Sequence, residues 1–212
     1  FVDLNRNNTE LDSAVITGVT KSVYTPRVLS GLGVIPRVVS NSRAIYRGKL
    51  TLDEATTRLD QYWRPYHTRL QSLLSAAQAS FGQAILIDCH SMPREALDGT
   101  FRAGQKRPEI IIGDRFGASA SSYIVDCIQD ILTEAGFTVS RNMPFAGAYI
   151  TQHYGRPSQR QHAVQLEIDR SLYMDEATLR PHAGFAQLCD QLDPVVAKLA
   201  DLGRACDRLA AE

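Results

Sequence analysis

The stretch Ala84–Ser91 reads AILIDCHS, so an unbroken apolar run leads directly into polar residues. A continuous apolar run of this length is typical of a strand that is buried on both faces of a sheet. We therefore predict a central strand here. Open α/β sheets bind their ligands at the carboxyl ends of such strands, so the residues that end this strand are the first candidates for a functional site.

Outward from this strand, strand-like and helix-like stretches alternate, and this order favours an α/β fold. Short apolar runs predict further strands at residues 1–4, 109–112, 137–140 and 163–168. Because the sequence begins without Met inside a predicted strand, we expect a single α/β domain over residues 1–212 that lacks an N-terminal segment.

The longest helical pattern covers residues 51–80. Thr51 and Glu54 have the spacing of a capping box, and apolar residues then recur every three or four positions. Pro65 is expected to kink or split this helix. Residues 9–50 lack such periodicity, so we predict a long irregular excursion there, and loops of this length are often functional.

The second half of the chain contains two more helical patterns. Residues 119–135 carry one apolar face, and Gly136 is placed to end the helix. From about residue 176 the chain is predicted to be helical, with breaks at Pro181 and Pro194.

The composition excludes several classes of protein. With 44% hydrophobic and 22% charged residues, the chain is not disordered as a whole. The 23 basic and 23 acidic residues balance, whereas nucleic-acid-binding proteins usually carry a basic excess. No apolar run is long enough for a membrane span. From the charge balance and the missing span, we expect a protein that binds neither nucleic acid nor membrane. The four cysteines form no CxxC pair, so we expect their thiols to be reduced, as in a cytoplasmic protein.

The first candidate site residue is His90. Side chains alternate along a strand, so Asp88 and His90 lie on one face of the predicted strand and Cys89 on the other. His90 can bind a metal, with Asp88 or a backbone carbonyl holding its ring. The alternative is a strand-end histidine with ordinary hydrogen bonds, which is the more frequent role of a lone histidine.

The second candidate is Glu167, in the strand predicted at residues 163–168. Gln165, Glu167 and Asp169 share one face of that strand. A carboxylate at the mouth of a buried strand can act as a general base, and a nearby Arg170 would favour its ionised form. A polar strand face that meets solvent is the alternative.

Two more segments carry polar groups suited to an anionic ligand. Arg6 offers a planar guanidinium that can hold a carboxylate through two hydrogen bonds, and Asn5 adds an amide donor. Tyr154 and Arg156 lie in a predicted loop at residues 150–157 that suits the cover of a small anionic substrate. For the segment with Asn5 and Arg6 a structural turn is the more frequent role, and for residues 150–157 a structural turn is an equally good interpretation.

In their order along the chain, these segments resemble the zinc carboxypeptidases and, more closely, the N-formylglutamate amidohydrolase family. The continuous stretch from Asn142 to Pro157 is the most specific part of the resemblance, which extends from residue 1 to about residue 176. The stretches that carry it are FVDLNR, GLGVIPRV, IYRG, RPYH, LIDCHSMP, GDRFG, NMPFAGAYITQHYGRP and HAVQLEIDRSLYMDE.

The resemblance implies a carboxypeptidase-like fold, with a mixed, mostly parallel sheet and helices on both faces. It also implies zinc-dependent hydrolysis of N-formyl-L-glutamate, or a similar N-acyl amino acid, to formate and glutamate. His90 would be a zinc ligand, and Glu167 would be the general base and acid. The other zinc ligands of the family precede the DLNR motif, so we expect them upstream of Phe1.

The resemblance further implies the residues that bind the substrate. Asn5 and Arg6 would hold its α-carboxylate, and Tyr154 would lie near it, together with His153 and Arg156. Two alternatives stay open: a carboxypeptidase or deacylase for larger N-acyl groups on the same scaffold, and a metal-free module that binds carboxylates.

Overall fold

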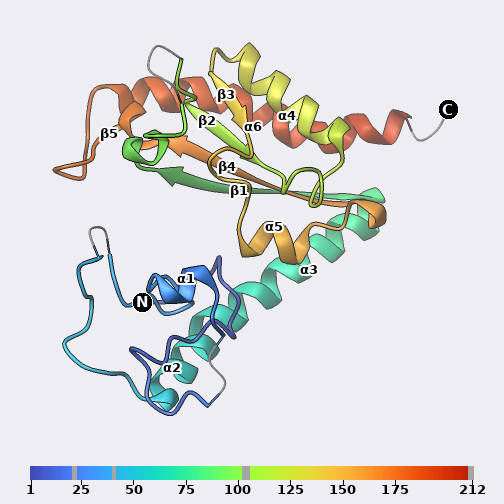
Figure 1. Ribbon diagram of the computed structural model, residues 1–212. Helices are drawn as coiled ribbons and strands as arrows, with labels where there is room; N and C mark the ends of the chain where they lie inside the picture. The colour runs from blue at the N-terminus through green and yellow to red at the C-terminus, as the bar shows by residue number, and fades with distance from the viewer. Residues whose placement is uncertain (21–22, 40–41, 102–105, 210–212) are drawn as a thin grey trace. The chain divides into compact units, whose positions relative to one another are not determined.

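The computed structural model describes residues 1–20, 23–39, 42–101 and 106–209, the last seven of them by their backbone alone (Figure 1). The chain divides into two compact units, Phe1–Leu73 and Leu74–Glu212. The expectation of a single domain that lacks an N-terminal segment stays a prediction.

The first unit is mostly irregular up to residue 50, as predicted. Its only α-helix before that point, within the described residues, is the four-residue α1 (Pro26–Leu29). The strand predicted at residues 1–4 is wrong, because Asp3 forms a turn there instead. Its carboxylate accepts a hydrogen bond from the backbone N–H of Asn5 at 2.8 Å, which curls the chain away from an extended path.

The predicted helix over residues 51–80 is confirmed, and Thr51 begins it. The Thr51 hydroxyl accepts a hydrogen bond from the backbone N–H of Glu54 at 3.1 Å. Pro65 does not split the helix, because a π-helical turn directly before it accommodates the missing N–H. The consecutive segments are α2 (Leu52–Arg58), η2 (Leu59–Trp63) and α3 (Arg64–Phe81).

The second unit contains the sheet, whose strand order is β1-β4-β2-β3. β1 runs parallel to β4 and β2 runs parallel to β3, whereas β2 and β4 are antiparallel. The mixed, mostly parallel sheet implied by the resemblance is therefore confirmed. The strands are β1 (Ala84–Met92), β2 (Ile110–Gly113), β3 (Val139–Arg141) and β4 (Gln161–Asp169).

β1 is not the central strand that its apolar run predicts. Among the described residues it lies at one end of the strand order, and most of its side chains are only half-buried. The central strand is β4, which is buried along almost its whole length. An apolar run shows that a strand packs against other elements, but it does not show how many strands flank it.

Helices cover both faces of the sheet (Figure 1). α4 (Ser122–Glu134) and α6 (Gly184–Leu209) lie on one face, and α5 (Tyr149–Tyr154) lies on the other. α4 ends as predicted, because Gly136 adopts a φ of +93° that favours glycine. The main core fills the space between the sheet, α4 and α6, and includes Ile110, Ile112, Ile124, Ile128, Leu132, Val164, Leu166, Leu188 and Val195.

The C-terminal segment differs from its prediction in two ways. Pro194 does not break α6, because Leu188, Val195 and Leu202 hold the helix against the core on both sides of it. Pro181 precedes that helix, in the short strand β6 (Arg180–Pro181), which pairs with β5 (Met174–Asp175).

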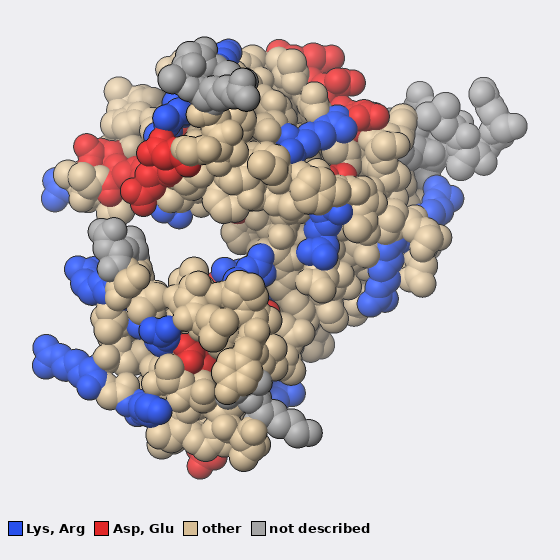
Figure 2. Space-filling model, viewed as in Figure 1, with Lys and Arg blue, Asp and Glu red and all other residues tan. Residues whose placement is uncertain are grey.

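Charges are mixed on the surface of the second unit. On the face shown in Figure 2, acidic and basic side chains lie interspersed over this unit. No helix in the described ranges has the combination of length and apolarity that a membrane crossing requires.

Candidate active site

The register of β1 and β4 brings His90 and Glu167 together. These residues are direct partners in the parallel pair, so their side chains leave the sheet on the same side. They lie on the polar face of the two strands, opposite the face that packs against α4 and α6. Asp88 and Gln165 form the next pair on this polar face.

His90 is held by Asp88, as the sequence suggested. The Nε2 atom of His90 lies 3.0 Å from a carboxylate oxygen of Asp88, and the histidine side chain is about one third exposed. A carboxylate beside a histidine ring fixes the orientation of that ring. The assignment of His90 as a metal ligand stays a prediction.

Glu167 is a buried carboxylate, with 9% of its surface exposed. Burial raises the pKa of Glu167, while the neighbouring His90 and a hydrogen bond from Gln165 act in the opposite direction. A carboxylate whose pKa lies above its usual value accepts a proton more readily near neutral pH. This environment suits a general base, and the role itself stays a prediction.

Gln165 connects Glu167 to the start of α5. Its Oε1 atom accepts a hydrogen bond from the backbone N–H of Ala148 at 3.0 Å, and its Nε2 atom donates to Glu167 Oε1 at 2.6 Å. Sequence reasoning placed Gln165 on the correct face but gave it no role. The alternation of polar residues in QLEID was the only available signal.

The described residues do not gather a metal site by themselves. Within the described ranges, no group of three or more His, Cys, Asp or Glu residues is arranged to hold an ion. Catalytic zinc usually has three protein ligands, so His90 with its neighbours does not fit a complete zinc site.

Asn5 and Arg6 lie in the first unit, where hydrogen bonds fix both residues. Arg6 donates from Nε to Leu32 O at 3.0 Å and from Nη1 to Asn5 O at 2.7 Å, and its Nη2 lies 3.4 Å from Asp3. These contacts hold the guanidinium in one orientation, as a carboxylate receptor requires. Contact between Arg6 or Asn5 and a substrate stays a prediction.

The segment predicted as a loop at residues 150–157 is mainly the helix α5. This correction has a packing reason, because Tyr149, Ile150 and Tyr154 are buried along one side of the helix. Tyr154 is 1% exposed, which is the burial of a core residue. Its predicted contact with substrate stays a prediction.

His153 and Arg156 are exposed at the end of α5. The ring of His153 stacks on Tyr149, with 5.0 Å between the ring centroids. Burial, followed by the charge of Arg156, lowers the pKa of His153. The substrate-binding roles predicted for His153 and Arg156 remain untested by this geometry.

Two further histidines, His67 and His162, have structural contacts. His67 is buried in α3, where its Nε2 atom lies 3.0 Å from Leu4 O. His162 lies on the face of β4 opposite Glu167, and its Nδ1 atom accepts a hydrogen bond from the backbone N–H of Ser121.

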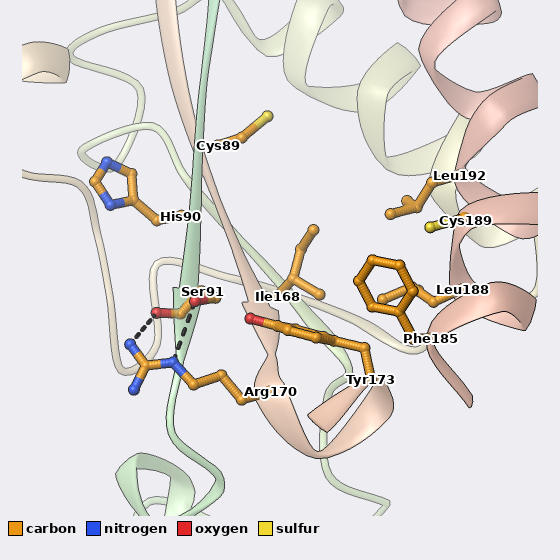
Figure 3. A pocket seen from close by; sticks show the side chains of 10 residues that line it. All are labelled: Cys89, His90, Ser91, Ile168, Arg170, Tyr173, Phe185, Leu188, Cys189 and Leu192. Carbon is orange, nitrogen blue, oxygen red and sulfur yellow. Dashed lines mark hydrogen bonds between the residues drawn. The ribbon is translucent and has the colours of Figure 1, made fainter. Parts of the chain in front are cut away.

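A cavity of about 550 Å³ opens on the α6 side of the sheet, and its lining includes His90 but not Glu167. In Figure 3 the ring of His90 points away from Cys89 and from the helix residues Leu188, Cys189 and Leu192. Arg170 closes one end of this cavity, where it donates two hydrogen bonds to Ser91 at 3.1 Å each. Of the His90–Glu167 pair, only His90 borders this cavity, and Glu167 lies on the polar face of the sheet outside it.

The chain is similar to known proteins of one family. Residues 1–174 match the family described as N-formylglutamate amidohydrolase. Two curated relatives are named N-formylglutamate deformylase. The one from Pseudomonas putida is 33% identical over 82% of this chain and 61% of its own length. The one from Pseudomonas aeruginosa is 32% identical over 80% of this chain and 63% of its own length. The chain thus spans about three fifths of the length of these relatives.

Solved structures agree as well. The crystal structure of N-formylglutamate amidohydrolase from Ralstonia eutropha has a TM-score of 0.87 and 32% identity, over 98% of this chain and 74% of that one. A gene product of Agrobacterium tumefaciens shares the fold at a TM-score of 0.56 and 17% identity, over 95% of this chain and 67% of that one. From the match over residues 1–174, the chain belongs to the N-formylglutamate amidohydrolase family.

Proposed function

We propose that the protein hydrolyses the formyl amide of N-formyl-L-glutamate to formate and glutamate. The observation that carries this proposal is the direct pairing of His90 with the buried Glu167 on the polar face of the sheet. The names of the two curated relatives support the choice of substrate.

In the proposed reaction, Glu167 transfers one proton. Its carboxylate takes a proton from water as the water oxygen attacks the formyl carbon. The same carboxyl group then gives this proton to the departing nitrogen while the carbon–nitrogen bond breaks. The products are glutamate and formic acid, which keeps the other hydrogen of the water and loses it to solvent to give formate, and Glu167 returns to its ionised form.

Zinc is part of the proposal through His90. A bound zinc ion polarises an amide oxygen and lowers the pKa of water. The described residues do not gather three ligands for such an ion. We propose that His90 supplies one zinc ligand and that the others come from outside the described residues.

Metal content tests the role of His90 directly. Elemental analysis of the purified protein is expected to find zinc in the wild type and a clear loss of zinc in His90→Ala. His182→Ala is a suitable control, because His182 bonds to Ser171 O and Gly184 N, away from the paired strands β1 and β4. A wild type without zinc, or equal zinc in the wild type and in His90→Ala, would contradict the proposal.

A substrate panel tests the reaction. Formate release from N-formyl-L-glutamate is expected to exceed acid or amine release from N-acetyl-L-glutamate and from dipeptides. Faster cleavage of the N-acetyl compound would indicate a deacylase, and faster cleavage of dipeptides would indicate a carboxypeptidase. Binding of glutamate without any hydrolysis would indicate a carboxylate-binding module.

Arg6→Ala is expected to weaken substrates that carry the α-carboxylate. Loss of one charge-assisted hydrogen bond costs about 1.5 kcal/mol, which is roughly a tenfold loss of kcat/KM. The measurement compares N-formylglutamate with its α-amide in the wild type, in Arg6→Ala and in the exposed control Arg47→Ala. An equal loss for both substrates in Arg6→Ala would argue against a carboxylate contact.

A further inference from the structure

We infer that Gln165 is a positioning residue, which fixes the carboxylate of Glu167 for proton transfer. This inference rests on the proposed role of Glu167 as the general base. Gln165 is itself buried, with 4% of its surface exposed, and it lies two residues from Glu167 on the same face of β4.

The orientation of the Gln165 amide follows from its two partners. The backbone N–H of Ala148 is a donor only, so the atom that it contacts, 3.0 Å away, must be the amide oxygen. The amide nitrogen then points to Glu167 Oε1 at 2.6 Å. Since a carboxylate oxygen accepts hydrogen bonds, both ends of the amide are matched, and a flipped amide would oppose donor to donor at Ala148.

The backbone around Ala148 is held firmly enough to act as an anchor. The Thr151 hydroxyl donates to Ala148 O at 2.9 Å. Gly113, which is the partner of Gln165 in β2, lets the preceding loop approach closely: a Cβ atom at Gly113 would lie 2.7 Å from the backbone nitrogen of Gly147. Ala148 therefore has little freedom to move away from Gln165.

The consequence for Glu167 is a fixed carboxylate. A glutamate side chain has three rotatable bonds, and a group that transfers protons works best when its orientation is set before the reaction. The hydrogen bond from Gln165 occupies Oε1 and so directs Oε2 toward the reacting water and amine. Only a side-chain amide of this length supplies an acceptor for Ala148 and a donor for Glu167.

The kinetic test uses Gln165→Met, which keeps the length of the side chain and removes both hydrogen bonds. We expect a roughly tenfold lower kcat with a nearly unchanged KM, because the loss concerns proton transfer and not binding. Gln161→Met is the matched control, since Gln161 is also a buried glutamine of β4 but bonds to Tyr154 O. Its kcat is expected to stay near that of the wild type.

A double-mutant cycle separates positioning from a general structural role. In the Glu167→Gln background, Gln165→Met is expected to cause no further loss of kcat. An equal loss in both backgrounds, or an unchanged kcat for Gln165→Met alone, would overturn the inference. If Gln165→Met fails to fold, Gln165→Leu removes the donor without adding a charge beside Glu167, and the same expectations apply.

Crystal structures distinguish failure of this inference from failure of the proposed function. In Gln165→Met the Glu167 carboxylate is expected to rotate away from its wild-type position, whereas in Gln161→Met it stays. An unmoved carboxylate overturns the inference whatever the activity. A wild type that does not cleave N-formylglutamate overturns the proposed function, and the position of the carboxylate then decides the role of Gln165 separately.

Discussion

Glu167→Gln is expected to lower kcat for N-formylglutamate by about 10² or more, because an amide cannot take a proton from water. The substitution keeps the size of the side chain, and its amide oxygen can still accept the hydrogen bond from Gln165. Binding of a substrate analogue that is not hydrolysed should therefore persist. Steady-state kinetics and titration calorimetry with such an analogue measure the two effects separately.

The matched control for this substitution is Glu134→Gln. Glu134 is an exposed glutamate at the end of α4, where it pairs with Lys198 at 2.7 Å. Exposed ion pairs contribute little to stability, so this variant should keep the activity of the wild type. If Glu167→Gln keeps a kcat near that of the wild type, Glu167 is not the base.

The pairing of His90 with Glu167 was only partly accessible from the sequence. Alternation along each strand predicted which face each of the two residues occupies, and the structure agrees. The register between β1 and β4 joins positions 77 residues apart in the sequence. No local pattern encodes that register, because it depends on how the whole sheet assembles.

The wrong predictions about the fold share one cause: each was made from a local pattern, whereas the structure depends on contacts that the pattern does not show. The apolar run of β1 predicted a central strand, but apolarity reports burial and not the number of neighbouring strands. Pro194 predicted a break, but packing of α6 against the core outweighs the local preference of proline. FVDL predicted a strand, but the hydrogen bond from the backbone N–H of Asn5 to the Asp3 carboxylate forms a turn there.

Gln165 was missed for a different reason. A buried glutamine two residues before Glu167 has no motif of its own, and its role depends on the N–H of Ala148, 17 residues earlier in the sequence. Long-range hydrogen bonds of this kind become visible only when the segment after β3 is folded back onto the sheet.

Gly155→Ala is expected to destabilise the protein by about 3 kcal/mol, at the upper end of the usual cost of overpacking. A Cβ atom at Gly155 would lie 2.3 Å from Ser119 Cβ and 2.6 Å from Thr151 O. Ser119 cannot easily move away, because its hydroxyl donates to Ala163 O at 2.7 Å and its carbonyl accepts from Ala163 N at 2.8 Å. Urea unfolding measures the free energy of unfolding of the variant and of the wild type.

The control and the activity of this variant show what the glycine in HYGRP is for. Gly48→Ala adds its methyl group to open space, so its free energy of unfolding should change by less than about 0.5 kcal/mol. If Gly155→Ala unfolds at the same urea concentration as the wild type, the close approach to Ser119 is wrong. If it is destabilised as expected, the C-terminal end of α5 is strained against Ser119, and only a displacement that reaches Ala148 at the start of α5 would weaken its hydrogen bond to Gln165. A kcat per folded molecule that is lower in Gly155→Ala than in the wild type would therefore indicate that the packing of Gly155 against Ser119 influences the orientation of Glu167.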